Sequence, residues 1–416
     1  MSSPGSLAVF VLLALAGCRD YAHFDRVPDA AADGSANVDA GPDSDGGVTA
    51  DGGGPVRLLQ LDGQGAATDA VALVHDGTAN SNLLLRVPAI LGPQPGGAQS
   101  FKIGQRGALF AAGPNQNGEA HVLVADATGT MTEYRWTGSM FEGVGMPVGP
   151  LPSSLAVHAV AILQLNAGHP QLVTVQVNLA DAGASATVLV YPGSATSLLD
   201  GVPASYPLAT SFNRPQHDAL SLVVSHDRAA NLRSLVAFLP SLSGNGGQAM
   251  VLPGTSTGFG SGVPLNPGTI MTAHTVATAP VDVVADHALP LNDNIVFGTD
   301  DGVEIFTLYP GGSQDQYLFQ TMRPVYALQV VDWNRDGAPD LFSFLKQFAQ
   351  GPYAATIFQN RGRITQPDFT VVSSTDNSAL VATMSPDSLR SPAVPDCGAV
   401  AVFVDPANAQ LSIFRP

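Results

Sequence analysis

A run of nine residues, Asp332–Asp340, carries oxygen-bearing side chains at its first, third, fifth and ninth positions and a glycine at its sixth. Ca²⁺ takes about six to eight oxygen ligands, and a tight loop can present alternate side chains to one centre. Glycine suits the sixth position because it adopts positive φ without steric cost. The candidate metal ligands are the side chains of Asp332, Asn334, Asp336 and Asp340 and the carbonyl of Ala338. We therefore expect one structural Ca²⁺ ion.

A metal-free polar turn is the alternative for this segment, because Asp, Asn and Gly are also ordinary turn formers. The flanking apolar runs, Tyr326–Val331 and Leu341–Leu345, are typical of strands. An EF-hand is disfavoured, since its twelfth position would be Ser343 instead of Glu. The segment is thus expected to be a loop between two strands, and a metal there would stabilise the fold without taking part in catalysis.

The N-terminus carries a second signal. Leu7–Ala16 is apolar but too short to cross a bilayer, and such a run is typical of a signal peptide. The Leu15-Ala16-Gly17-Cys18 segment that ends it resembles the lipobox of bacterial lipoproteins. The resemblance implies a signal peptide over residues 1–17 and lipidation of Cys18. The first six residues contain no Lys or Arg, which departs from the usual pattern, and an ordinary secretory signal or an uncleaved anchor are the alternatives.

The lipoprotein resemblance also implies an address. Arg19 follows the lipidated cysteine where an Asp would favour inner-membrane retention, so we expect an outer-membrane lipoprotein of a bacterial cell envelope. Residues 18–55 are expected to be a disordered tether, because 29–54 contain no aromatic and no large aliphatic residue to offset chain entropy. With Cys18 acylated, Cys397 has no disulfide partner within the chain, and we expect a buried, inert thiol there.

The composition indicates an all-β fold over residues 56–416. Short apolar runs alternate with turn residues, 44 Gly and 32 Pro among them, and no long stretch shows helical periodicity. The formal charge of −17 argues against nucleic acid and against direct docking on anionic lipid. We expect contact with a membrane only through the lipid anchor.

An internal repeat is the main evidence for architecture. Seven apolar runs recur roughly 46 to 57 residues apart, with one gap of roughly 75. These runs are Ala70–Val74, Ala120–Ala125, Gln171–Val177, Ala219–Ser225, Asn294–Gly298, Asp340–Leu345 and Ala399–Val404. Each is followed by a second run: Leu83–Pro88, Glu133–Gly138, Val188–Gly193, Leu235–Pro240, Val303–Pro310, Ala355–Gln359 and Leu411–Pro416. Seven hairpins predict a β-propeller of seven blades.

Two points of this assignment are open. We interpret Ser241–Thr269, rich in small and turn residues, as an inserted loop that accounts for the long gap. A different assignment around 241–290 would give six or eight blades. The chain ends directly after the last hairpin, and a segment near Val56 or before it must complete the last blade.

At this point the sequence resembles a known family. The unit of an apolar run, Asp-x-Asn-x-Asp-Gly-x-x-Asp and a second apolar run is similar to the FG-GAP or VCBS repeat of integrin-like propellers. That family binds Ca²⁺ in a loop between the first two strands of a blade. Only Asp332–Asp340 keeps the full pattern, and three degenerate copies precede other runs. They are Asp62–Gly65 with Asp69, the group Asn115, Asn117 and Gly118 before His121, and Asn166–Gly168.

Two familiar catalytic motifs are missing from the sequence. It contains no phosphate-binding loop and no His-Glu-x-x-His helix. Four His–Asp neighbours are candidates for a metal site or general base, although chance pairing explains them as well: His75-Asp76, His217-Asp218, His226-Asp227 and Asp286-His287. The aromatic residues on second runs, such as Tyr134, Trp136, Tyr191 and Phe358, are expected to pack blades together instead of stacking on sugars.

The sequence therefore predicts a lipid-anchored, non-enzymatic propeller that binds a protein or glycan partner through its loops. The alternative is a propeller hydrolase or lyase that acts on polysaccharide with His and Asp residues at the channel. A third hypothesis is a structural role in a larger envelope complex. Convergence of three or more of the His–Asp residues on one point would favour the enzyme.

Overall fold

The computed structural model describes residues 10–13, 20–24, 56–59, 61, 69–76, 81–88, 97–103, 107–126, 128–165, 169–178, 185–208, 220–227, 230–239, 246–265, 272–279, 293–308, 314–321, 323–331, 340–346, 353–360, 369–377, 393–394, 398–399, 401–405 and 410–415. Every regular element in these ranges is a β-strand. No helix forms there, and so none long and apolar enough to cross a membrane. The all-β expectation is confirmed.

The strands form antiparallel four-stranded sheets that follow one another along the chain. Sheet 1 contains β3 (Val56–Leu59), β4 (Asp69–Asp76), β5 (Ser81–Val87) and β6 (Gln99–Ile103). Sheet 2 contains β7 (Gly107–Pro114), β8 (Ala120–Asp126), β9 (Met131–Trp136) and β10 (Phe141–Val148). Sheet 3 contains β11 (Leu155–Gln164), β12 (Pro170–Asn178), β13 (Ala186–Tyr191) and β14 (Ala204–Pro207).

The following sheets have the same form. Sheet 4 contains β15 (Ser221–Asp227), β16 (Leu232–Leu239), β17 (Gln248–Leu252) and β20 (Val263–Pro264). Sheet 5 contains β21 (Ala273–Ala279), β22 (Asn294–Thr299), β23 (Gly302–Leu308) and β24 (Gln314–Gln320). Sheet 6 contains β25 (Val325–Val331), β26 (Asp340–Lys346), β27 (Tyr353–Asn360) and β28 (Phe369–Asn377).

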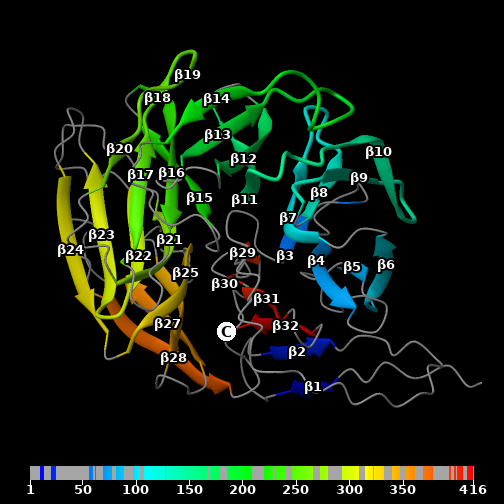
Figure 1. Cartoon of the computed structure of the whole chain (residues 1–416). Coiled ribbons are helices and arrows are strands. Elements are labelled where there is room, and N and C mark those ends of the chain that lie inside the picture. Colours follow the sequence, from blue (N-terminus) through cyan, green and yellow to red (C-terminus); the bar gives the residue numbers. More distant parts are fainter. Residues whose placement is uncertain are drawn as a thin grey trace, which may run out of the picture.

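Strands from both ends of the chain share the remaining four-stranded sheet. Sheet 7 has the order β31 (Ala401–Asp405), β32 (Gln410–Arg415), β2 (Asp20–Phe24) and β1 (Phe10–Leu13). Two short hairpins complete the described strands: β18 (Gly254–Thr255) with β19 (Gly258–Phe259), and β29 (Ala393–Val394) with β30 (Gly398–Ala399). The sheets are arranged around a common centre in chain order (Figure 1).

The first strands of successive sheets line this centre. β3 lies beside β7, β7 beside β11, β11 beside β15, β15 beside β21 and β21 beside β25. β31, the first strand of sheet 7, lies beside β3. Within each sheet the later strands are hydrogen-bonded in order away from the centre. This is a propeller-like arrangement, in which successive sheets from sheet 1 to sheet 6 pack face to face.

The pairing of β2 with β32 shows how the chain termini meet, which the sequence left open. Asp20 pairs with Arg415 and Phe24 with Leu411, so the N-terminal segment adds strands outside the C-terminal hairpin. β1 lies within residues 1–17 and β2 within 18–55, the ranges expected to be signal peptide and tether. The other residues of 1–55, Cys18 included, lie outside the described ranges. For them the signal peptide and the disordered tether stay predictions.

Sheet 4 corrects one sequence interpretation. Ser241–Thr269 was expected to be an inserted loop, but it contributes β17 and β20, the third and fourth strands of the sheet. Only the hairpin β18–β19 is an addition to the four-strand pattern. The error arose because the hairpin β15–β16 forms the first and second strands here, as β31–β32 does in sheet 7, whereas the matching hairpins of sheets 1, 2, 3, 5 and 6 form the second and third. The long gap therefore arises mainly because the hairpin detected in sheet 4 lies one strand earlier in its sheet than the hairpin detected in sheet 5.

The core lies between neighbouring sheets. Val236 and Phe238 of β16 face sheet 5, whereas Leu235 and Ala237 of the same strand face sheet 3. Because both faces of an inner strand are buried, these strands have continuous apolar runs instead of alternating ones. This explains why the second runs of the repeat were easy to find in the sequence. Burial of a side chain such as Phe238 contributes about 1.5–3 kcal/mol.

Candidate functional site

The connections between strands gather at two ends of the ring. In antiparallel sheets arranged around one axis, the connections between first and second strands and between third and fourth strands lie at the same end. We call this the Asp340 end, because the predicted calcium loop connects β25 with β26, which begins at Asp340. The opposite end carries the turns between second and third strands, such as Asp300-Asp301.

Asp340 is the one predicted metal ligand within the described residues. It is fully buried at the start of β26, and its Oδ1 accepts a hydrogen bond of 2.8 Å from the backbone N–H of Asn360. Asp332, Asn334, Asp336 and Ala338 lie outside the described ranges. A donor set of three carboxylates, one amide oxygen and one carbonyl suits Ca²⁺, and a buried carboxylate beside the loop fits such a site. The calcium site itself stays a prediction.

Of the degenerate copy in sheet 1, Asp69 lies within the described ranges and pairs with an arginine. Asp69 begins β4 as Asp340 begins β26, and it is buried. The Nε of Arg86 donates to Asp69 Oδ2 at 2.7 Å. The guanidinium carbon of Arg86 lies 4.2 Å from the ring centre of Trp136 on sheet 2, a cation–π contact between sheets. At this position a side-chain cation balances the buried carboxylate.

The copy in sheet 2 is a hydrogen-bonded turn. Asn115 Oδ1 accepts from the backbone N–H groups of Asn117 (2.9 Å) and Glu119 (3.0 Å). Gly118, which matches the glycine of the nonapeptide, has a φ of 81°, a region that favours glycine. Asn115 Nδ2 donates to the carbonyl of Ala195 at 2.7 Å. The Asn115 amide thus organises this turn through hydrogen bonds.

This turn leads to a buried polar network. His121 Nε2 lies 3.0 Å from Asn115 Nδ2, and His121 Nδ1 lies 2.6 Å from Glu133 Oε1. Both His121 and Glu133 are buried. The neutral imidazole with its proton on Nδ1 satisfies both contacts, because it donates to the carboxylate and accepts from the amide.

Glu133 in turn holds the connection between β13 and β14, residues 192–203. Its carboxylate accepts from Ser197 Oγ (2.6 Å) and from the backbone N–H groups of Leu198 (2.7 Å) and Leu199 (3.3 Å). Burial raises the pKa of Glu133, but the hydrogen bonds from His121, Ser197 and Leu198 outweigh it and bring that pKa below its ordinary value. The network therefore keeps the carboxylate ionised and the 192–203 connection in one conformation.

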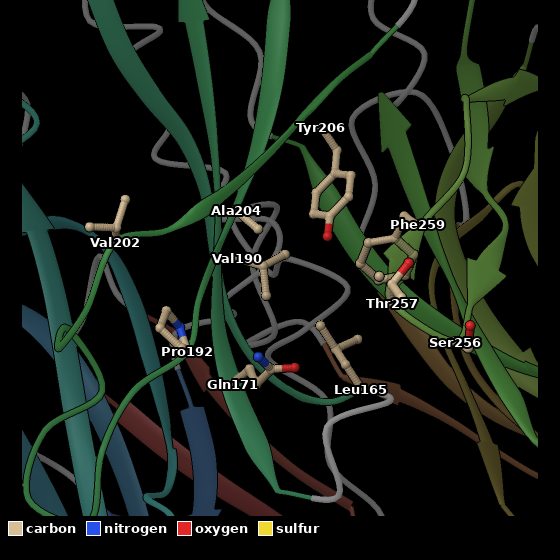
Figure 2. A pocket seen from close by; sticks show the side chains of 11 residues that line it. Leu165, Gln171, Val190, Pro192, Val202, Ala204, Tyr206, Ser256, Thr257 and Phe259 are labelled. Atoms are coloured by element: carbon tan, nitrogen blue, oxygen red, sulfur yellow. The ribbon is translucent and has the colours of Figure 1, made fainter.

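A groove at the Asp340 end lies between this connection and the hairpin β18–β19. Its volume is about 270 Å³. Figure 2 shows the side chains that surround it. Sheet 3 supplies Leu165, Gln171, Val190, Pro192, Val202, Ala204 and Tyr206, and the hairpin supplies Ser256, Thr257, Gly258 and Phe259. None of these residues is charged, which is notable in a chain with a formal charge of −17.

Polar groups without protein partners line this groove. Within the described residues, no hydrogen bond engages the side chains of Gln171, Tyr206, Ser256 or Thr257. The Tyr206 and Phe259 rings meet edge to face with centroids 5.2 Å apart, and both are half-buried. The Tyr206 hydroxyl points toward the hairpin in Figure 2. An apolar wall with a few free polar groups is the usual character of a small-ligand site.

The hairpin β18–β19 is fixed closely to its surroundings. A Cβ on Gly254 would lie 2.3 Å from the carbonyl oxygen of Arg233, so only glycine fits there. Gly258 has a φ of 146°, and a Cβ there would collide with the Tyr206 hydroxyl. Arg233 Nη1 also donates to the carbonyl of Leu165 at 2.8 Å, which joins sheet 4 to the floor of the groove. The two sides of the groove are thus held together.

The predicted His–Asp neighbours do not converge in the part of the chain that the structure describes. His75 and His226 end β4 and β15, two different sheets, and His217 and His287 lie outside the described ranges. His226 Nε2 lies 3.2 Å from Asn231 Oδ1. No group of three His, Cys, Asp or Glu residues that could hold a metal ion occurs among the described residues.

The structure instead forms a His–Asp pair that the sequence did not suggest. His274 Nε2 lies 2.8 Å from Asp300 Oδ1 at the opposite end of the ring from the groove. The His274 ring stacks on Tyr326 with centroids 4.1 Å apart. Burial and the charge of Asp300 raise the pKa of Tyr326. The two partners are 26 residues apart, so no local pattern could identify them.

Glu133, Arg86, Tyr206 and Phe259 were also missed by sequence analysis. A charged residue in an apolar strand of a chain with only 12% charged residues is a signal that could have identified Glu133 and Arg86. The packing role expected for aromatic residues is confirmed for Tyr191 and Phe358, which are buried. Cys397 and Asn166–Gly168 lie outside the described ranges.

No protein-family model matches the sequence, and no curated protein matches it. Among solved structures, the chain is similar to the BP39L lectin from Burkholderia pseudomallei, with 13% identity, a TM-score of 0.53 and coverage of 87% of this chain and 95% of that chain. It is similar to the S. cerevisiae core factor, with 7% identity, a TM-score of 0.54 and coverage of 88% and 57%. It is also similar to BBS1N in complex with ARL6DN, with 10% identity, a TM-score of 0.50 and coverage of 88% and 94%. At these identities the likeness shows the fold, an all-β, propeller-like arrangement of sheets.

Proposed function

We propose that this chain is a non-enzymatic binding protein, a β-propeller that holds a glycan partner in the groove between sheets 3 and 4. The observation that carries the proposal is the set of unpartnered polar side chains, among them Gln171 and Tyr206, on an apolar wall. Glycans present hydroxyl groups and apolar ring faces together, and such a wall matches both. A flat protein partner would leave the half-buried Gln171 and Tyr206 side chains without hydrogen bonds.

Two properties of the structural neighbours support a binding role. BP39L is a lectin, and BBS1N was crystallised in complex with ARL6DN. Propellers host many unrelated functions, so the fold by itself does not assign one. The groove chemistry favours the glycan over the protein partner.

We further propose seven blades, with the ring closed by pairing between the chain termini. Sheets 1 to 6 supply six blades, and β31, β32 and β2 supply the seventh. A lipoprotein cleaved before Cys18 would lose β1 but keep β2, which begins at Asp20. In this proposal the mature chain keeps the strand that closes the ring, and the acyl chains of Cys18 lie beside the outer edge of the last blade.

The lipid anchor, the outer-membrane address and the structural Ca²⁺ ion are parts of the same proposal. The lipobox-like Leu15–Cys18 segment supports the anchor, and the Asp332–Asp340 pattern supports the ion. Mass spectrometry of the N-terminal peptide from cells tests the anchor. A free or unprocessed Cys18 would remove the anchor and with it the proposed address, and would leave the binding role unaffected.

The binding role is tested with the full chain, purified in detergent, on an immobilised panel of bacterial polysaccharides and oligosaccharides. Saturable binding to a subset of glycans supports the proposal. Binding to none of them, with the protein shown to be folded by its thermal melt, contradicts it. Shortening of a bound polysaccharide chain would instead favour the hydrolase or lyase, for which the His274–Asp300 pair is the structural candidate.

A further inference from the structure

The groove between sheets 3 and 4 also contains evidence for the class of glycan. We propose that it takes one neutral pyranose residue and rejects acidic sugars; this inference rests on the proposed function. All eleven residues that line the groove are uncharged. An acidic sugar would bring a carboxylate against a lining without a charged side chain, in a chain of strongly negative charge. The Arg233 guanidinium behind the floor already donates to the carbonyl of Leu165. A buried charge without a partner is costly, so the neutral residue is favoured.

The polar groups of the groove match the hydroxyls of a sugar ring. Gln171 offers both a donor and an acceptor from β12, and the Tyr206 hydroxyl offers both from β14. Ser256 and Thr257 add two hydroxyls from the turn of the hairpin β18–β19, on the other side of the groove. Each sugar hydroxyl can donate and accept a hydrogen bond, and each of these four side chains can serve as its acceptor or its donor.

The apolar wall matches the ring carbons of the same sugar. Val190 and Phe259 lie between the polar groups, with Leu165 as the floor. The C–H groups of one face of a pyranose ring would pack against this surface and leave the hydroxyls at its edge free for hydrogen bonds. Removal of this apolar area from water adds to affinity without any need for charge.

The size of the groove limits the ligand. Its volume of about 270 Å³ lies below the range of about 300–1,000 Å³ that is typical for drug-sized ligands. One ring therefore fits, and an extended oligosaccharide must continue into solvent. The exposed Pro192 and Val202 border the open side, where a second sugar or an aglycone would lie.

The hairpin β18–β19 is the specificity-determining element in this proposal. It is the one addition to the four-strand pattern of sheet 4, and it supplies one complete side of the groove. Gly258 lets the hairpin approach the Tyr206 hydroxyl, since any Cβ there would displace the tyrosine. We expect Gly258→Ala to push the two sides apart and to weaken binding without loss of the fold.

The experiment uses the full chain and pairs of methyl glycosides that differ only at C6: neutral hexoses and the matching hexuronates. Dissociation constants come from isothermal titration, and the bound face comes from saturation-transfer NMR. We expect at least tenfold tighter binding of the neutral member of a pair. Tyr206→Phe, which removes only the hydroxyl, is expected to weaken binding about two- to tenfold, and Gln171→Ala similarly. Ser205→Ala, an exposed neighbour on the same strand β14, is the matched control and should leave binding unchanged.

Three outcomes would overturn the inference and are distinguishable. Equal or tighter binding of the hexuronates would contradict the neutral class while the glycan-binding function stands. Neutral sugars that bind equally well to the Tyr206→Phe and Gln171→Ala proteins would place the site elsewhere on the molecule. Absence of binding to either class, together with no binding to the polysaccharide panel, would reject the proposed function and this inference together.

Discussion

Two buried glutamates lie on the third strands of their sheets, Glu133 in sheet 2 and Glu304 in sheet 5, and their surroundings differ. Glu133 receives hydrogen bonds from His121 and from the 192–203 connection, and its pKa lies below the ordinary value. Glu304 has an oxygen, Oε2, without a hydrogen-bond partner in the described structure. Burial, with the nearby charge of Asp301, raises the pKa of Glu304 to about 7.

The difference shows that burial alone does not decide the charge of a carboxylate. Desolvation acts on both groups, and the local donors decide whether the ionised form is favoured. In sheet 2 the charge is used to hold a loop at the edge of the proposed glycan groove. In sheet 5 burial raises the pKa of the carboxyl group to about 7, and no described donor offsets the cost of its ionised form.

The largest expected effect comes from removal of the satisfied carboxylate. Glu133→Ala leaves His121 and two backbone N–H groups of the 192–203 connection without their acceptor, so we expect a loss of about 3–5 kcal/mol in the free energy of unfolding. Denaturant unfolding measures it. Glu142→Ala, at an exposed position on the adjacent strand β10, is the control. An equal, small effect of both substitutions would show that the network does not stabilise the fold.

Glu304→Gln should increase the free energy of unfolding, in contrast to Glu133→Ala, and the increase should depend on pH. Since the pKa of Glu304 is raised from 4.5 to about 7, the folded state binds more protons than the unfolded state between these values, and stability falls as pH rises through that window. The neutral variant avoids this loss. We expect Glu304→Gln to be more stable than the parent at pH 8, by at most about 3 kcal/mol, and equally stable at pH 4.

For Glu133 the dependence of stability on pH has the opposite direction. Its folded pKa is lowered, so its contribution is present above the unfolded pKa and is lost as pH falls through the folded value. Unfolding curves of the parent and of the two variants across pH 3 to 8 therefore separate the two glutamates. If the free energy of unfolding of Glu133→Ala and of Glu304→Gln changed with pH in parallel, the two glutamates would not differ as proposed.

Asp340 extends the comparison to a third buried carboxylate, for which the sequence predicts a metal. Ca²⁺ at about 100 times its dissociation constant should stabilise the full chain by about 2.7 kcal/mol, and Asp336→Ala should abolish this effect. Thermal melts in Ca²⁺ and in chelator measure it. The full chain is required because β2 pairs with β32 in sheet 7. An identical Ca²⁺ effect in the variant, or none in either protein, would leave the segment as a polar turn.

The smallest effect is expected from the amide that organises the turn in sheet 2. Asn115→Ala removes hydrogen bonds to Asn117, Glu119 and Ala195, and we expect a loss of about 1–2 kcal/mol. The difference in melting temperature between parent and variant should be the same with and without chelator, because the hydrogen bonds of the Asn115 amide organise this turn. A difference that depends on Ca²⁺ would show that this turn also binds metal.

The sequence predicted the repeat well because the inner strands are apolar on both faces. The runs Ala120–Ala125 and Asn294–Gly298 coincide with β8 and β22 for this reason. The phase of the repeat was harder to predict, because first and second strands have the same apolar character. The hairpin β15–β16 was therefore aligned with hairpins that form second and third strands, and β17 was assigned to an inserted loop.

The groove could not be predicted in the same way. Gln171, Tyr206 and Phe259 belong to three elements, and none of them has a distinctive neighbour pattern in the sequence. The aromatic residues that the repeat singled out, such as Tyr191 and Phe358, are buried in the core instead. Tyr206 and Phe259 lie on short edge elements that the apolar periodicity does not detect.

The sequence by itself determined the all-β class and the approximate repeat, because these follow from local composition and spacing. Tertiary structure decided which polar residues meet. Glu133 contacts Leu198 across 65 residues, and His274 meets Asp300 across 26. Such contacts depend on how neighbouring sheets pack around the ring, and side-chain hydrogen bonds then decide whether a buried carboxylate is ionised, as in Glu133, or stays protonated to higher pH, as in Glu304.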